Sequence, residues 1–154
     1  EVSALTGKSS STDFLKSIGA DNIIMRDEYL EAPAKALERP LFASAIDTVG
    51  GNVLSKMLPQ ISPHGVVACC GNVAGIEINT TVFPFILRGI TLAGIDSAES
   101  PIEFKTSIWN KFADEWKLDL SSMIKVVSKE SLQQEIDLIL EGGQQGRVVL
   151  QHGE

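Results

Sequence analysis

The stretch from residue 42 to residue 72 constrains the fold most, because it reads as strand, helix and strand in quick succession. Residues 43–46 and 66–70 are short apolar runs, and between them apolar residues recur at helical spacing: Val53, Leu54, Met57, Leu58 and Ile61. Unbroken apolar runs are typical of strands that are buried on both faces of a parallel sheet. The pattern predicts an α/β fold, in which ligands bind beyond the carboxyl ends of the strands. In this chain those ends are residues 47–51 and 70–75.

Composition excludes several classes of protein. The chain has 154 residues, of which 44% are hydrophobic and 21% charged, and this is enough for a globular domain with a core. The net charge of -7 and the absence of basic runs exclude nucleic acid as the main partner. No apolar stretch reaches the roughly 18 residues that a membrane span needs, and no signal peptide is evident. We therefore expect a soluble, cytoplasmic protein with no membrane partner.

The cysteines and histidines do not form a recognisable metal or catalytic set. Cys69 and Cys70 are adjacent on a predicted strand, so their side chains point to opposite faces. They lack the spacing of a zinc or redox motif, and we expect both to be buried strand residues. His64 in a turn and His152 near the end are expected to be solvated. The prediction is therefore no metal, and the catalytic residues stay unknown.

Other strands are predicted at residues 2–5, 22–25, 90–95, 124–127 and from Arg147 onward. Helices are expected after Thr12, at 83–87, after Pro101 and at 132–140. Residues 9–12 offer several hydroxyl N-caps for the first of them, with Ser10 and Asp13 at capping-box spacing. The acidic segment 27–40 contains Pro33 and is interpreted as a surface connection. The aromatic residues of the helix after Pro101 are expected to pack in the core: Trp109, Phe112 and Trp116.

Two successive strands are followed by a cation. Thr6, Gly7 and Lys8 follow the first strand, with hydroxyl residues and no acid, and Arg26 follows the second. Dinucleotide folds that select NAD usually place an acid at the end of such a strand, whereas a cation accommodates the 2′-phosphate of NADP. The pattern favours NADP, and a solvated surface lysine is the alternative. A P-loop is excluded because Val2 stands where that motif needs glycine.

Several strings resemble a known family: LTGK after a strand, AIDTVGGNVLSKML, CCGN, TTVFPFILRGITLAGIDS and QGRVVL. Together they are similar to the later half of a zinc-free medium-chain dehydrogenase/reductase, in the branch that contains the NADPH-dependent acryloyl-CoA reductases and quinone oxidoreductases. The likeness covers nearly the whole chain. It is strongest over residues 43–97 and weakest over 27–40 and 101–130.

The resemblance implies a partial Rossmann-type, doubly wound parallel sheet over residues 1–98. Residues 99–154 would be C-terminal elements that return to the catalytic domain. The first strand and the Gly-rich turn of the fold are not in the sequence, so we expect a fragment of a protein about twice as long. In the strand order 3-2-1-4-5-6, the missing strand would lie between the strands at 2–5 and 43–46.

The resemblance also implies an activity and a cofactor site. The whole protein would be an enzyme that transfers hydride from NADPH to an enoyl thioester such as acryloyl-CoA, or to a quinone-like substrate; the fragment alone is expected to be inactive. The residues implied to bind NADP(H) are Thr6, Gly7, Lys8, Arg26, Asn72, Ile86 and Ser97. Of these, Thr6 to Lys8 with Arg26 would hold the 2′-phosphate, and the others would line the rest of the cofactor. Lys8 replaces the more usual Arg of the family, and Asn72 a usually apolar residue.

Relatives often pair the strand at 90–95 with its copy, which implies a homodimer. The alternative to an enzyme is a non-catalytic NADP-binding sensor or interaction module. A methyltransferase on a similar sheet would place an acid after the second strand of its fold, and residues 6–11 contain none.

Overall fold

The computed structural model describes residues 1–152 and divides into two compact units. One unit comprises residues 26–105, and the other combines residues 1–25 with the chain from residue 106 onward. The predicted boundary between residues 98 and 99 concerns the domains of a longer protein and stays a prediction. Within the described part, no helix has the length and apolar character that crossing a membrane requires.

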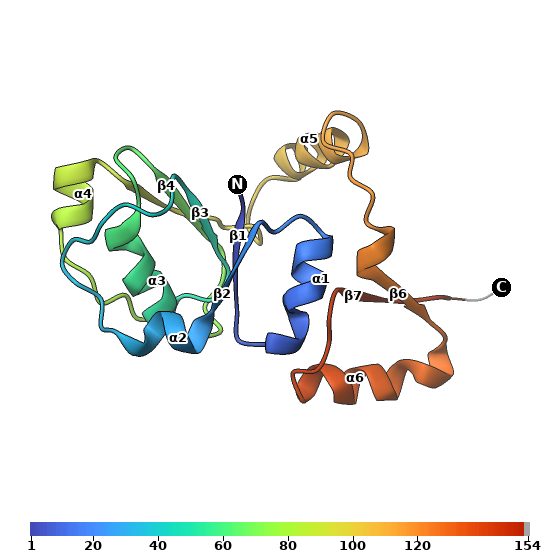
Figure 1. Ribbon diagram of the computed structural model, residues 1–154. Helices are drawn as coiled ribbons and strands as arrows, with labels where there is room; N and C mark the ends of the chain where they lie inside the picture. Colours follow the sequence, from blue (N-terminus) through green and yellow to red (C-terminus); the bar gives the residue numbers. More distant parts are fainter. Residues whose placement is uncertain (153–154) are drawn as a thin grey trace. The chain divides into compact units, whose positions relative to one another are not determined.

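The unit of residues 26–105 is built on a three-stranded parallel sheet in the order β3-β4-β5 (Figure 1). Its elements in chain order are α2 (Arg26–Glu31), β3 (Ala45–Asp47), α3 (Gly51–Met57), the 3-10 helix η2 (Leu58–Gln60), β4 (Val66–Cys69), α4 (Phe83–Arg88) and β5 (Thr91–Gly94). Ala45 is in register with Val67, and Val67 with Leu92. These bounds confirm the predicted strand, helix and strand of residues 42–72.

The core of this unit forms where α3 and η2 pack on the sheet. Its buried residues are Leu54, Leu58, Ile61, Val67 and Ile90. Leu58, Ile61 and Val67 are fully buried at 0% exposure. Shortening a buried leucine to alanine lowers the free energy of unfolding by about 2–5 kcal/mol in a typical core. The packing of this cluster therefore stabilises the sheet whose strand ends are described below.

The segment after strand β2 (Asn22–Met25) corrects one prediction. We expected a surface connection over residues 27–40, but α2 begins at Arg26 and ends at Glu31, before Pro33. The extended part that follows is anchored by polar contacts. Tyr29 donates a hydrogen bond to Gln60 (2.6 Å), and Gln60 donates one to Glu38 (2.8 Å). The Arg88 guanidinium donates to the carbonyl oxygens of Pro59 and Ile61 at 2.7 and 2.9 Å, and to that of Glu38.

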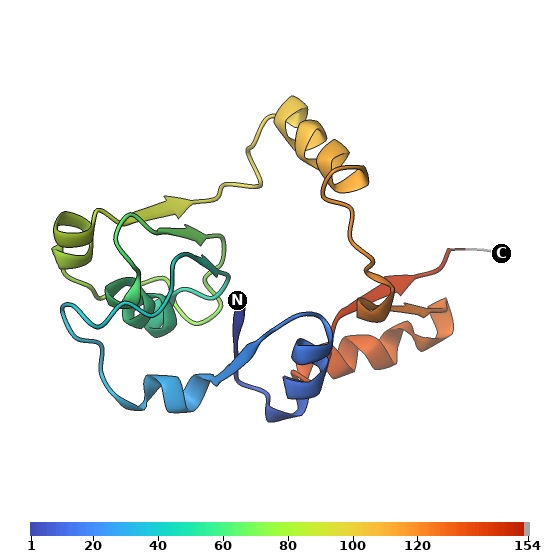
Figure 2. The same cartoon turned by 45° about the horizontal axis from the view of Figure 1, so that its top comes forward.

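The other unit contains two parallel strand pairs, β1-β2 and β6-β7. Its elements are β1 (Ser3–Thr6), η1 (Ser9–Ser11), α1 (Thr12–Ser17), β2 (Asn22–Met25), η3 (Ser121–Met123), β6 (Ile124–Val127), η4 (Lys129–Ser131), α6 (Leu132–Leu140) and β7 (Arg147–Leu150). Helix α5 (Ile102–Ala113) begins in the first unit and ends in this one. In both views α6 lies beside β6 and β7 (Figures 1 and 2).

The parallel α/β architecture is confirmed, and the five strands from β1 to β5 form separate sheets of two and three strands. Among residues 1–152, β1 pairs only with β2, and β3 pairs only with β4. In the order 3-2-1-4-5-6, β1 and β2 correspond to strands 2 and 3, and β3, β4 and β5 correspond to strands 4, 5 and 6. The pairs observed within each sheet agree with this order.

Three smaller expectations are wrong. Ser10 and Asp13 form no capping box: the N-cap of α1 is Ser11, one of the hydroxyl residues 9–12, and its side chain makes no capping bond. Cys70 lies just after β4 and is exposed, whereas Cys69 is half-buried. The aromatic residues Trp109 and Phe112 on α5, and Trp116 just after it, contact one another in succession but are exposed at 70%, 45% and 42%. Helical spacing predicts which residues share a face, but not what covers that face.

Candidate functional site

The carboxyl ends of β3 and β4 are held together backbone against backbone. Asp47 is 2% exposed, and its two carboxylate oxygens accept the Gly50 N–H at 3.1 and 3.0 Å. The Cys70 N–H donates to the Asp47 carbonyl (2.9 Å), and the Ala74 N–H to that of Val49 (2.7 Å). Asp47 therefore has a structural role at the strand end, consistent with its absence from the predicted site residues.

Glycine is required where these two loops meet. Gly50 has φ +68°, and a Cβ on it would collide with the Gly75 carbonyl oxygen. A Cβ on Gly71 would collide with the Thr48 carbonyl. Glycine at both positions allows the backbones of the two loops to approach each other more closely than any side chain would permit. The loops after β3 and β4 thus form one backbone-lined surface at the end of the sheet.

Beside this surface lies an open depression of about 520 Å³ at the ends of β4 and β5. It is lined by Cys69, Cys70, Gly71, Asn72, Gly94, Ile95 and Asp96. Of the predicted cofactor residues in this unit, Asn72 lines the depression and Ser97 directly follows its last lining residue. Ile86 lies on α4, is 68% exposed and does not line it.

The Cys69 thiol at this depression is not poised as a nucleophile. Burial, together with the hydrogen bond and negative charge of Asp47, raises the pKa of the Cys69 thiol. Its Sγ lies 3.4 Å from Asp47 Oδ2, and Cys70 Sγ lies 3.5 Å from the Asp47 carbonyl oxygen. Because the thiolate is the reactive form, neither geometry nor charge favours covalent chemistry at Cys69.

The end of β1 places Thr6, Gly7 and Lys8 in a tight turn. The Lys8 N–H donates to Thr6 Oγ1 (3.1 Å), and its ammonium donates to the Gln144 carbonyl oxygen (2.9 Å). Within residues 1–152, no carboxylate forms an ion pair with Lys8. One of its three N–H groups is used in the bond to Gln144, and two remain for an anion.

Arg26 is the first residue after β2, whose last residue Met25 is in register with Thr6. Its guanidinium pairs with the neighbouring Asp27, Nη2 to Oδ1 at 2.9 Å, and is 48% exposed. Such an exposed pair contributes little and can be exchanged for another anion. Arg26 is therefore accessible to a ligand.

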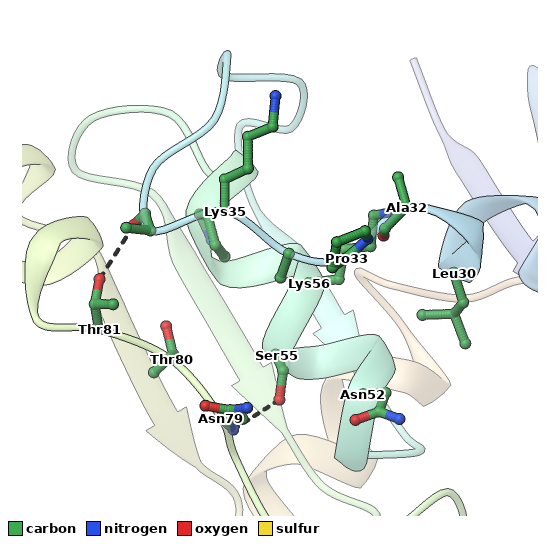
Figure 3. A pocket seen from close by; sticks show the side chains of 13 residues that line it. Leu30, Ala32, Pro33, Lys35, Asn52, Ser55, Lys56, Asn79, Thr80 and Thr81 are labelled. Carbon is green, nitrogen blue, oxygen red and sulfur yellow. Dashed lines mark hydrogen bonds between the residues drawn. The ribbon is translucent and has the colours of Figure 1, made fainter.

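A second pocket of about 370 Å³ lies between residues 30–36, α3 and residues 79–81 (Figure 3). None of the predicted site residues lines it. Its polar groups mostly bond to one another: Ser55 accepts the Asn79 N–H (2.9 Å), Thr81 donates to Ala36 O (3.1 Å), and Lys56 donates to Ala32 O (2.5 Å). Lys35 extends away from the other labelled side chains (Figure 3). These bonds connect the surrounding loops to one another and to α3. This pocket is separate from the depression at the ends of β4 and β5.

The sequence profile described as zinc-binding dehydrogenase matches residues 1–114. The chain belongs to the zinc-binding dehydrogenase family. The α/β fold class and the recognition of this chain as the later half of a medium-chain dehydrogenase/reductase are thereby confirmed. In this family member, residues 1–152 contain no group of three or more His, Cys, Asp or Glu side chains that could hold a metal ion. Zinc does not fit the described residues, and no chemistry is assigned to it.

Relatives of known name share most of this chain. It is 38% identical over 151 residues to the acrylyl-CoA reductase AcuI of Ruegeria pomeroyi. It is 36% identical over 152 residues to a Bacillus subtilis protein named "Putative quinone oxidoreductase YhfP". In both cases the match covers 97% of this chain and 46% of the relative. The chain thus spans about half the length of these dehydrogenases.

Two solved structures also match nearly all of this chain over about half of their own length. The yhdH oxidoreductase of Salmonella enterica, in complex with NADP, matches with TM-score 0.90 and 35% identity over 99% of this chain and 47% of that one. The Bacillus subtilis protein yhfP, with NAD bound, matches with TM-score 0.91 and 36% identity over the same shares. Nicotinamide dinucleotides therefore bind to relatives that superpose on this chain.

Proposed function

We propose that the protein containing this chain is an NADPH-dependent oxidoreductase that reduces an enoyl thioester such as acryloyl-CoA. Lys8 is the observation that supports the proposal most, because it is a cation with no acidic partner among residues 1–152, at the strand end where the adenosine ribose lies in dinucleotide folds. The acrylyl-CoA reductase relative and the relative with bound NADP support the substrate and the cofactor. A quinone-like substrate is the second candidate, supported by the name of the Bacillus relative.

NADPH would supply the hydride, and the residues of this chain would bind and orient it. Lys8 and Arg26 would pair with the 2′-phosphate, and Thr6 with Gly7 would shape the turn that holds it. Asn72 and Ser97, at the ends of β4 and β5, would lie along the nicotinamide half, with Ile86 contributing an apolar surface. Asn72 is exposed beside Gly71, where the backbone is accessible. No residue of this chain is assigned as proton donor.

The reaction is tested by supplying the whole protein with NADPH and either acryloyl-CoA or simple quinones. We expect NADPH oxidation with acryloyl-CoA at a higher kcat/KM than with any quinone, measured by the loss of NADPH absorbance. Turnover of quinones alone would remove the thioester substrate and leave a reductase. NADPH binding without turnover of either class would favour the sensor or interaction module.

Cofactor choice is tested by the double substitution Lys8→Ala with Arg26→Ala in the whole protein. A charge-assisted hydrogen bond contributes about 1.5–3 kcal/mol, so each lost contact should weaken NADPH binding by roughly 10-fold to 100-fold. NADH lacks the 2′-phosphate and should bind almost unchanged. Calorimetric Kd values for both cofactors measure the difference.

Lys16→Ala is the control for the loss of a single charge, because Lys16 lies in the last turn of α1 and its loss changes the net charge as much as either of the two substitutions does. It should leave both Kd values near those of the wild type. Lys8→Arg should keep the preference for NADPH, since the charge is retained. An equal loss of NADPH and NADH affinity in the double variant would contradict the assignment.

A further inference from the structure

The loop after α6 reaches the turn that carries Lys8, although the two are far apart in sequence. Lys8 Nζ donates to Gln144 O at 2.9 Å, across 136 positions. The Gln145 side-chain amide donates to Ser10 O at 3.0 Å and to Ser11 Oγ at 3.1 Å. Both views show the end of α6 close to α1 (Figures 1 and 2). All these residues belong to one compact unit.

Glycines and backbone bonds fix the course of this loop. Helix α6 ends with hydrogen bonds from the Gly142 and Gly143 N–H groups to the carbonyls of Ile139 (3.0 Å) and Leu138 (2.9 Å). Gly142 and Gly146 have φ +73° and +68°, in the left-handed region. A Cβ on Gly146 would collide with the Met123 carbonyl oxygen. The loop is therefore held at both ends, with Gln144 and Gln145 between them.

The Gln145 amide also holds the turn that precedes α1. Ser11 is buried at 6% exposure, and its hydroxyl accepts a hydrogen bond from the Gln145 amide while making no capping bond to α1. Gln145 thus ties the 9–11 turn to the loop, while the Gln144 carbonyl holds the ammonium of Lys8. One N–H of that ammonium is used, and two remain for a ligand.

We infer that the 142–146 loop is part of the site for the adenosine 2′-phosphate, with Gln145 as a positioning residue for Lys8; this rests on the proposed NADP binding. A lysine side chain loses up to about 2 kcal/mol of rotamer entropy when it is immobilised. The Gln144 carbonyl orders the ammonium before the ligand arrives, so less of this cost falls on binding. The selectivity for a 2′-phosphate should therefore depend on Gln145, which does not itself carry charge.

The test compares two nucleotides, adenosine 2′,5′-bisphosphate and AMP, on the whole protein by calorimetry. Their ratio of Kd values reports the 2′-phosphate alone and needs no turnover. We expect the wild type to prefer the bisphosphate, Gln145→Ala to reduce that ratio about 3-fold to 10-fold, and Gln145→Glu to reduce it further. The last effect arises because a carboxylate cannot donate to Ser10 O and repels phosphate.

Gln133→Ala is the control, because Gln133 also donates from its amide, to Asp137 Oδ1 at 2.9 Å, but lies exposed on α6. It should leave the ratio unchanged. In a Lys8→Ala background, Gln145→Ala should have no further effect on the ratio, since a residue that acts through Lys8 loses its effect without it. Thermal unfolding of each variant shows whether the protein remains folded.

The outcomes separate the two proposals. A wild type that prefers the bisphosphate, with a ratio unchanged in folded Gln145→Ala and Gln145→Glu variants, would overturn the role of the loop and leave NADP binding intact. An effect of Gln145→Ala that persists without Lys8 would also overturn it. A wild type that binds AMP and the bisphosphate equally would overturn both the loop's role and the proposed NADP selectivity.

Discussion

Tyr29 is a half-buried phenol in a chain that contains one tyrosine. Its hydroxyl donates to Gln60 Oε1 (2.6 Å), and the Lys56 ammonium lies 5.1 Å from the centre of its ring. Burial, and then the negative charge of Glu38, raise the pKa of Tyr29 well above its ordinary value. The folded chain therefore favours the neutral phenol, whereas the unfolded chain ionises it near pH 10.

This shift gives stability a pH dependence with a definite sign. A raised folded pKa means that the stabilisation is complete below about pH 10 and is lost as the pH rises through the folded value. The free energy of unfolding should therefore fall above pH 10, by up to about 1.4 kcal/mol per pH unit from this group. Tyr29→Phe should remove that part of the slope, at a cost at neutral pH of about 1 kcal/mol for the lost hydrogen bond.

Phenolate absorbance of the 154-residue chain gives the measurement, because no other tyrosine contributes. Denaturant unfolding of both variants at neutral and high pH gives the slopes. Phenolate that appears near pH 10 in the folded chain would contradict the prediction.

At the scale of the element, β5 has one free edge within the described part of the chain. The N–H groups of Thr91 and Ile95 donate to carbonyls of the β4 side, Gly65 O and Cys69 O, both at 2.9 Å. Because backbone N–H groups alternate along a strand, that of Gly94 points to the other edge. An unpaired edge is a template for another strand, and we propose that β5 pairs there with its copy in a homodimer.

Gly94 offers a matched pair of variants, since a Cβ there meets nothing within 4 Å. Gly94→Pro removes the outward N–H and should shift the whole protein from dimer to monomer in sedimentation equilibrium. Gly94→Ala keeps the N–H and should remain dimeric. A wild-type protein that is monomeric, or a proline variant that stays dimeric, would rule out this interface.

At the scale of the whole molecule, local sequence patterns determine the order of the secondary-structure elements, whereas long-range contacts determine how loops and side chains are held. The alternation of apolar runs, glycine stops and helical spacing over residues 42–72 predicted the order β3, α3, β4, and parallel pairing followed from the crossover. The cation after β1 and the absence of an acid there were also visible in sequence. These features depend on neighbours a few positions apart, where geometry is set by backbone sterics and side-chain periodicity.

Other predictions failed for reasons that local sequence patterns do not show. Ser10 and Asp13 form no capping box, because residues 9–11 form a 3-10 turn that runs into α1; the Ser11 hydroxyl accepts a hydrogen bond from Gln145, 134 positions away. The helix at 26–31 was missed because Pro33 seemed to forbid it, yet the helix ends before the proline. Periodicity placed the α5 aromatics on one face but could not tell whether that face is covered.

The sequence by itself determined the succession β3, α3, β4 with its parallel pairing, and the cation at the end of β1. Only the tertiary structure decided that the loop after α6 holds that cation. The Gln144 and Gln145 contacts span 136 and 135 positions and involve a backbone carbonyl and two flanking glycine turns. Neither a carbonyl nor a positive φ leaves a periodic signal in sequence, so the partner of Lys8 appears only when the chain is folded.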